Sequence, residues 1–206
     1  MVERYQSDLN KIKNLDDEAK ELGMGGNYLA VNEKLYQKRM EKRKEIQTQR
    51  LKERNLEKGL VIVFTGNGKG KTTASLGMAL RTLGHGQKVA VIQFIKGAWS
   101  TGEKKAFENF SNSIEWRSLG AGFTWETQNR NEDQFLVQRA WEVAKKYIKN
   151  ESYKLVILDE INIAIKLGYI TSEEIIRFIR NINNKKNLCH VILTGRGASE
   201  EIIDFA

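Results

Sequence analysis

The pattern of hydrophobic and polar positions changes near Gly59. Residues before this point are mostly polar and charged, whereas short apolar runs alternate with amphipathic stretches after it. The apolar runs predict strands at residues 60–65, 88–95, 113–117, 155–159 and 191–194. The amphipathic stretches predict helices at residues 72–83, 103–110 and 131–148, a helix that begins at the capping pair Thr171 and Glu174, and a last helix near the C-terminus.

This order of elements predicts an α/β fold. Apolar strands that alternate with helices are typical of a mostly parallel sheet with helices on both faces. We therefore expect two parts: a charged, helical N-terminal extension over residues 1–58 and one α/β domain over residues 59–206.

The segment 33–58 contains good helix formers and no helix breaker. Its apolar residues do not share one helical face, and it carries like charges four residues apart, which mildly destabilise an isolated helix. These pairs are Lys38/Lys42, Arg39/Arg43, Arg50/Arg54 and Arg54/Lys58. Two interpretations remain open: a helix surrounded by solvent, or a segment that orders only against a partner surface or a ligand.

Composition limits the classes of function. The single cysteine, Cys189, excludes an internal disulfide, and no segment has the apolar length of a signal peptide or a membrane span. We therefore expect a cytoplasmic protein with no membrane partner. The net charge of +8 favours anionic partners. Residues 1–58 carry 14 Lys and Arg against 11 Asp and Glu, a difference of only +3, so we expect no DNA binding.

The sequence "TGNGKGKTT" at residues 65–73 directly follows the apolar run "LVIVF". Its second half, Gly70-Lys71-Thr72, matches the phosphate-loop pattern G-x-x-x-x-G-K-[ST], whereas Thr65 occupies the position of the first glycine. A dinucleotide-binding fingerprint fits less well, because Lys71 stands where the third glycine of that pattern belongs. The alternative, a lysine-rich turn, is weakened by the strand before the loop and the helix after it.

The chemistry of this loop suits a nucleotide triphosphate. Glycines let successive backbone N–H groups point inward around an anion, and the next helix adds its positive end. Lys71 supplies a full charge, and the Thr72 hydroxyl can hold magnesium. The predicted phosphate-binding residues are Gly66, Asn67, Gly68, Lys69, Gly70, Lys71, Thr72 and Thr73.

Two further strand ends carry polar residues. "KLVILDE" ends in Asp159 and Glu160, and in P-loop proteins a carboxylate here approaches Mg²⁺ directly or through water. Which of the two carboxylates touches the metal stays open. "LTGRGAS" places Arg196 between two glycines, where it either contacts a phosphate or is an exposed turn residue.

Longer motifs narrow the function. "GHGQKVAVIQFIKGAWSTGE" and "GAGFTWETQNR", together with "TGNGKGKTT", "VILDEINIA" and "LTGRG", closely resemble the P-loop ATP:corrinoid adenosyltransferases. The resemblance runs in one collinear order from about residue 40 to the C-terminus. It implies a RecA-like P-loop NTPase fold and an adenosyltransferase domain over residues 59–206.

The resemblance also implies a reaction. Cobalt(I) of a corrinoid substrate attacks the ribose 5′-carbon of ATP, and the whole triphosphate leaves, with Mg²⁺ or Mn²⁺ as the metal. It further implies an electron donor such as a flavodoxin or a flavin reductase, and a homodimer. Gln93, Lys96 and Arg196 are candidate nucleotide contacts. Relatives continue with a further strand and a tail, whereas this sequence stops at Ala206, so we expect either a naturally short chain or a truncated one.

Phe123 and Trp125 lie in the motif "GFTWETQ". From their spacing alone, two large rings on a loop favour packing into a core. The resemblance implies that they face the corrinoid and help to remove the lower axial ligand of cobalt(II), where aromatic walls would also exclude water.

Two other classes of function compete with this interpretation. A P-loop ATPase or kinase would release ADP, and it would need a residue that orients water or a hydroxyl group, for which the sequence offers no candidate. A nucleic-acid binder that uses the N-terminal segment is disfavoured by its small net charge.

Overall fold

The computed structural model describes residues 33–54, 58–95, 101–120, 129–183 and 189–206. It divides into two units, Met1–Leu56 and Glu57–Ala206, which we describe separately. In the first unit, helix α2 spans Glu33–Glu53. Most of its described side chains are exposed, and Ile46 is a buried exception. The predicted helix is therefore present, and the choice between a solvated helix and a segment that orders on a partner stays a prediction.

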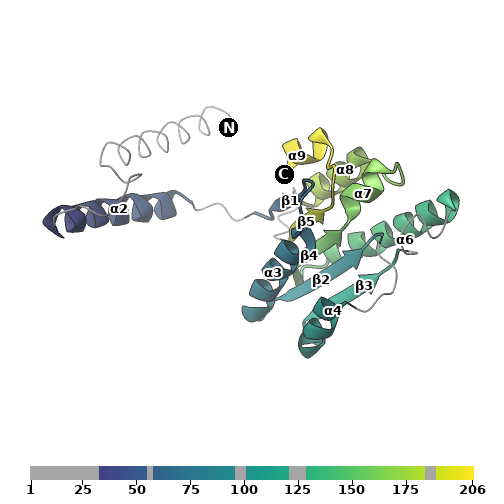
Figure 1. Cartoon of the computed structure of the whole chain (residues 1–206), viewed down its shortest axis with the longest axis horizontal. Helices are drawn as coiled ribbons and strands as arrows, with labels where there is room; N and C mark the ends of the chain where they lie inside the picture. The colour runs from purple at the N-terminus through teal and green to yellow at the C-terminus, as the bar shows by residue number, and fades with distance from the viewer. Residues whose placement is uncertain (1–32, 55–57, 96–100, 121–128, 184–188) are drawn as a thin grey trace. The chain divides into compact units, whose positions relative to one another are not determined.

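The second unit alternates strands and helices as the sequence predicts (Figure 1). Its strands are β1 (Val61–Phe64), β2 (Lys88–Gln93), β3 (Ile114–Ser118), β4 (Tyr153–Asp159) and β5 (His190–Thr194). Its helices are α3 (Lys71–Gly84), α4 (Gly102–Phe107), the 3-10 helix η1 (Glu108–Phe110), α6 (Arg130–Lys149), α7 (Ile161–Lys166), α8 (Ser172–Asn183) and α9 (Glu200–Phe205).

The strands form one parallel sheet in the order β1-β5-β4-β2-β3. Strand β5 therefore separates β1, which leads into the phosphate loop, from β4, which ends in Asp159. The parallel sheet and its alternating helices confirm the expected α/β fold. Because all strands are parallel, their carboxyl ends meet along one edge of the sheet, where ligands bind in open α/β folds.

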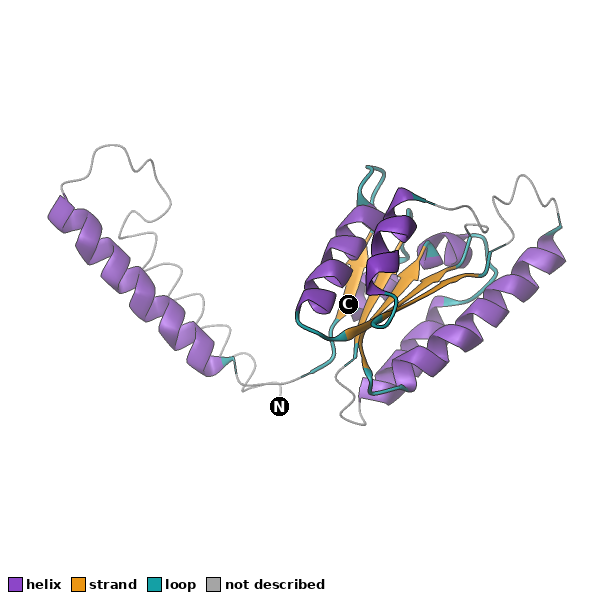
Figure 2. Ribbon diagram, turned by 90° about the horizontal axis from the view of Figure 1, so that it is seen from below, coloured by secondary structure: helices purple, strands orange, loops and turns teal. Residues whose placement is uncertain are grey.

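Alternate side chains of the strands enter two cores, one on each face of the sheet. Ala90, Ile92 and Phe94 pack with α6, α7 and α8, whereas Val89 and Val91 pack with α3 and α4. Helices accordingly lie on both sides of the sheet (Figure 2). Burial on both faces explains why these strands are almost continuously apolar in sequence.

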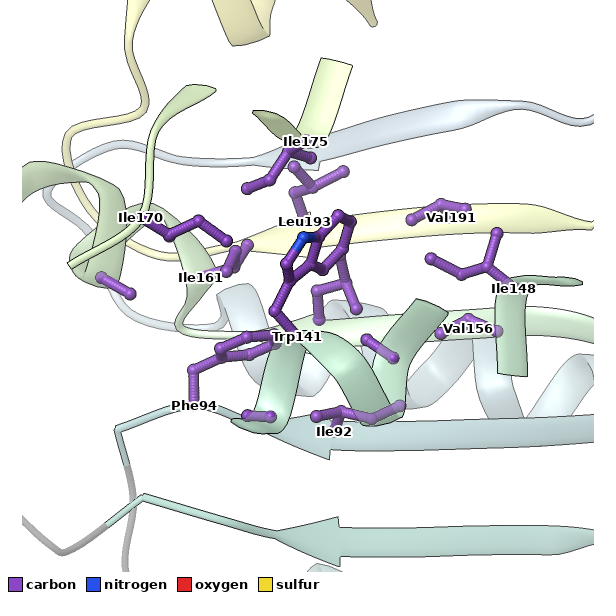
Figure 3. Packing of buried hydrophobic residues seen from close by; sticks show 14 of the residues in the cluster. Ile92, Phe94, Trp141, Ile148, Val156, Ile161, Ile170, Ile175, Val191 and Leu193 are labelled. Carbon is purple, nitrogen blue, oxygen red and sulfur yellow. The ribbon is translucent and has the colours of Figure 1, made fainter. Parts of the chain in front are cut away.

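Trp141 of α6 is fully buried in the larger core. It lies among Phe94, Ile161, Ile175 and Leu193, which come from four separate segments of the chain (Figure 3). Its ring meets that of Phe178 edge to face, with the centroids 5.3 Å apart. This packing joins α6 and α8 to the sheet and so fixes the strand ends that carry the polar residues.

The sequence prediction missed helix α7. Six residues are too few for a helical period to be recognised, and α7 starts abruptly after Glu160. The other elements agree within two residues at most ends, and the Thr171 cap is confirmed: its hydroxyl accepts a hydrogen bond from Glu174 N at 3.2 Å. The single cysteine, Cys189, is buried.

Candidate functional site

The phosphate loop joins β1 to α3. Gly66 and Gly70 have φ angles of 98° and 101°, a left-handed conformation that glycine adopts without steric cost. A Cβ atom at either position would meet nothing within 4 Å, so the backbone conformation, and not crowding, requires glycine. Gly70 is the N-cap of α3 and makes no side-chain cap hydrogen bond. A helix start of this kind is suited to bind an anion through its first amide groups.

Lys71 curls back over its own loop. Its ammonium group donates hydrogen bonds to the carbonyl oxygen of Gly66, at 2.8 Å, and to that of Gly68. The positive charge is therefore held at the centre of the loop, where it can meet a phosphate together with the loop amides.

Asp159 is the centre of a hydrogen-bond network at the carboxyl edge of the sheet. Its side chain is fully buried. Oδ1 accepts hydrogen bonds from the hydroxyls of Thr72, at 2.9 Å, and Thr194, at 2.8 Å. Oδ2 accepts one from Nε2 of Gln93 at 3.0 Å. Three donors from three different elements satisfy this buried carboxylate and fix it next to the start of α3.

Glu160 lies in a different environment from its neighbour. Its φ angle of 63° is the only positive one among the described non-glycine residues. Its backbone N–H donates to the Thr194 hydroxyl at 2.9 Å, and its carbonyl accepts from Ile163 and Ala164 at the start of α7. The chain thus turns sharply after Asp159, which leaves Asp159 buried and Glu160 half-buried. Of the two carboxylates, that of Asp159 accepts the hydrogen bond from the Thr72 hydroxyl.

The loop that carries Arg196 lies beside the phosphate loop. Gly195 N donates to the carbonyl of Phe64 at 3.2 Å, and Ala198 N donates to the hydroxyl of Thr65 at 3.2 Å. The threonine that replaces the first glycine of the usual pattern therefore connects the two loops. Arg196 is exposed next to this connection, so a phosphate contact remains open to it.

Gln93 was predicted as a nucleotide contact. Its side chain is 4% exposed, and its amide binds Asp159 and two residues of β3. The structure thus places Gln93 at the site as a neighbour of the carboxylate. A direct contact with the nucleotide stays a prediction.

The sequence analysis missed Thr194, Trp116 and Ser118, which also belong to this network. Thr194 and Ser118 are the last residues of β5 and β3. A polar residue that ends an apolar strand of a parallel sheet is a signal that could have identified them, because such ends meet at one edge. No comparable signal marked Trp116.

Three predicted site residues, Lys96, Phe123 and Trp125, lie outside the described residues, so their roles stay predictions. Gly120, which lies just before the segment with Phe123 and Trp125, packs tightly on the backbone of Phe94 and Ile95, directly after β2. A Cβ atom there would come within 2.5 Å of the backbone carbon of Ile95, so only glycine fits.

The residues present fit a magnesium ion. Among the described residues, no cluster of three or more His, Cys, Asp or Glu could enclose a metal. Mg²⁺ does not need such a cluster, because it usually binds one or two carboxylates together with water and substrate phosphates. The hydroxyl of Thr72 and the carboxylate of Asp159 supply hard oxygen atoms side by side at the mouth of the phosphate loop.

A comparison with known protein families identifies the family of this chain. The family profile described as "ATP:corrinoid adenosyltransferase BtuR/CobO/CobP" matches residues 57–206. The chain belongs to the ATP:corrinoid adenosyltransferase family. The match covers the phosphate loop, Asp159 and the Arg196 loop, and it begins after α2.

Individual relatives agree with this assignment. A corrinoid adenosyltransferase from Sinorhizobium sp is 49% identical over 151 residues, which cover 73% of this chain and 70% of the relative. One from Pseudomonas aeruginosa is 42% identical, with 83% of each chain covered. One from Escherichia coli K12 is 39% identical, with 85% of this chain and 87% of the relative covered. The chain is therefore a transferase with a corrinoid substrate. In the part of the chain that the structure describes, no helix has the length and apolarity to cross a membrane.

Proposed function

We propose that the chain transfers the 5′-deoxyadenosyl group of ATP to cobalt(I) of a corrinoid in the biosynthesis or salvage of adenosylcobalamin. The electron pair of cobalt(I) forms the new bond to the ribose 5′-carbon. The bond from that carbon to the α-phosphate oxygen breaks, and triphosphate leaves with its electron pair. Membership of the family supports the corrinoid as acceptor, and the phosphate loop supports ATP as donor.

The observation that carries the proposal is the contact between Thr72 and Asp159 at the end of the phosphate loop. These two residues would hold Mg²⁺, which supplies charge neutralisation for the triphosphate when it is bound. Lys71 and the loop amides bind the same phosphates and stabilise the negative charge that grows on the leaving group. No side-chain nucleophile is required, because the attacking atom belongs to the corrinoid.

The remaining task of the chain is to position the 5′-carbon next to cobalt, in line with the leaving oxygen. Arg196 would contact the triphosphate from the loop next to Thr65. Phe123 and Trp125 would line the corrinoid side, displace the lower ligand of cobalt(II) and exclude water from the reduced metal.

Several features of the working enzyme belong to the same proposal. We expect Mg²⁺ as the metal, with Mn²⁺ as a substitute, since both prefer oxygen ligands. An electron donor such as a flavodoxin or a flavin reductase would reduce cobalt(II), and the enzyme would act as a homodimer in the cytoplasm. The N-terminal segment 1–58 would be an extension to the catalytic domain 59–206.

The main competing function is that of an ATPase or kinase that releases ADP. A single experiment separates the two. The protein is incubated with ATP, Mg²⁺ and a chemically reduced corrinoid, and the phosphate product is identified by ion-exchange chromatography. We expect triphosphate in equal amount to adenosylated corrinoid. ADP and inorganic phosphate with an unchanged corrinoid would overturn the proposal.

A further inference from the structure

A row of side chains crosses the sheet at its carboxyl edge. Parallel register pairs Ser118 of β3 with Gln93 of β2, and Gln93 with Asp159 of β4. Paired residues of parallel strands point to the same face, so these three side chains lie next to one another. This is the face that α3 covers, which explains how Thr72, at the start of α3, reaches Asp159.

Strand β3 supplies two hydrogen-bond donors to this row. The indole Nε1 of Trp116 donates to Oε1 of Gln93 at 3.0 Å, and the Ser118 hydroxyl donates to the same oxygen at 2.8 Å. Both lone pairs of the amide oxygen are therefore used. The amide nitrogen of Gln93 is left on the other side, where it donates to Oδ2 of Asp159.

The orientation of this amide decides whether it stabilises or opposes Asp159. An amide presents an oxygen on one side and an N–H₂ group on the other, and a rotation by half a turn exchanges them. The rotated amide would point its oxygen at a buried carboxylate and its N–H₂ at the indole N–H of Trp116, which can only donate. That rotation is costly, because it would leave these groups without hydrogen-bond partners.

We propose that Trp116 and Ser118 are positioning residues, which act through Gln93 to hold the carboxylate of Asp159 in the orientation that binds the metal. The inference rests on the proposed function, because it assigns the metal to Asp159. Neither residue touches Asp159, and both lie on β3, at the far edge of the sheet from the phosphate loop. The site thus draws on four of the five strands, together with α3.

The alternative is that Trp116 serves only to pack the core. Its ring does lie against Phe107, with the centroids 6.0 Å apart. Packing and orientation can be separated, because Trp116→Phe keeps an aromatic ring, although a smaller one, against Phe107 and removes the N–H donor. Ser118→Ala removes the other donor, and Ser118→Thr restores a hydroxyl group.

Strand β3 also offers a matched control between these two positions. Arg117 points to the opposite face, where its guanidinium donates to Tyr147 at 3.3 Å and to Glu115 at 3.0 Å. Arg117→Ala therefore disturbs the same strand and leaves the Gln93 amide intact.

The experiment measures the affinity of the full chain for Mn²⁺ in the presence of ATP, by electron paramagnetic resonance, without a corrinoid. We expect Trp116→Phe and Ser118→Ala each to weaken Mn²⁺ binding by about three- to tenfold, the range of one lost hydrogen bond. Ser118→Thr and Arg117→Ala should bind as the wild type does. Melting curves on the same preparations confirm that each variant is folded.

The same substitutions in a Gln93→Met variant test whether the two residues act through Gln93. In Gln93→Met no amide is present, so Trp116→Phe and Ser118→Ala should cause no further loss of Mn²⁺ affinity in that background. Equal losses in both backgrounds would show that the two residues do not act through Gln93, and would overturn the inference. If Gln93→Met does not fold, wild-type affinity in the single variants overturns it equally.

The outcomes distinguish this inference from the proposed function. Normal Mn²⁺ binding by every variant would overturn the inference and leave the proposed function intact. The expected pattern of Mn²⁺ affinities, with no adenosyl transfer to a reduced corrinoid, would support the inference and overturn the proposed reaction. A wild-type chain that binds no Mn²⁺ with ATP would overturn both.

Discussion

Thr72 and Asp159 are 87 residues apart in sequence, and the Thr72 hydroxyl donates a 2.9 Å hydrogen bond to Oδ1 of Asp159. Thr72 is the second residue of α3, at the end of the phosphate loop, and Asp159 is the last residue of β4. Their contact joins the two halves of the proposed magnesium-nucleotide site across the intervening strand β5.

Removal of the negative charge of Asp159 should abolish metal binding and leave the fold intact. We expect Asp159→Asn to lower turnover about 100-fold or more, because a neutral amide cannot neutralise a metal held against the triphosphate. Thr72→Ser keeps the hydroxyl and should remain close to the wild type, whereas Thr72→Val should fail. The measurement is a Mg²⁺ titration of turnover beside a melting curve. Full activity of Asp159→Asn would remove Asp159 from the metal site.

The charge of Lys71 is expected to bind the leaving triphosphate. Lys71→Ala should lower turnover by orders of magnitude, with little change in melting temperature, because the group that it contacts changes charge in the transition state. Lys88→Ala is the matched control, since it removes the same charge from an exposed position. Lys88 begins β2, at the end of that strand opposite to Gln93. A near wild-type rate in Lys71→Ala would contradict the role of the loop.

Phe123 and Trp125 should act on the corrinoid and not on ATP. We expect Phe123→Ala and Trp125→Ala to keep ATP affinity and to lose the spectroscopic signature of four-coordinate cobalt(II). Strong chemical reduction should partly rescue them, because cobalt(I) scarcely holds the lower ligand. The measurements are an ATP titration, cobalt(II) spectra and a melting curve on the same preparations.

If these two rings belong to a core instead, a different result follows. Each alanine variant would then lose about 3–5 kcal/mol of stability. A large drop in melting temperature with unchanged cobalt spectra would therefore rule out the corrinoid-facing role.

Cys189 should be unreactive while the chain is folded. Burial raises the pKa of its thiol from the usual 9.0 to about 12, although the nearby charge of Lys154 and a backbone hydrogen bond at Val156 act in the opposite direction. At pH 8 the reactive thiolate is then scarcer by about three orders of magnitude than in an exposed cysteine, so labelling by iodoacetamide should be slow. Labelling of the folded protein as fast as in denaturant would contradict this.

The same shift sets a direction for stability against pH. The folded thiol holds its proton more tightly than the unfolded one, so this contribution is complete below the unfolded pKa and is lost as pH rises toward about 12. Cys189→Ala removes the titrating group. Its melting temperature should therefore fall less between pH 8 and pH 11 than that of the wild type.

The sequence by itself determined the alternation of strands and helices, the phosphate loop and the family. These features are local: the apolar runs of β1, β2, β4 and β5 record burial on both faces of a sheet, and "TGNGKGKTT" places its glycines and Lys71 within nine consecutive residues. Asp159 and Glu160 are also adjacent in sequence, so the sequence identified both carboxylates as candidate metal ligands.

Only the tertiary structure decided which of these residues meet. The order β1-β5-β4-β2-β3 depends on how the strands pair, which no local pattern records. That order places Thr194 and Gln93 on either side of Asp159 and brings Ser118 next to Gln93. Trp116 joins the network because its indole reaches from β3 to the end of β2. The partners of a buried carboxylate come from separate strands, so they become visible only when those strands lie side by side.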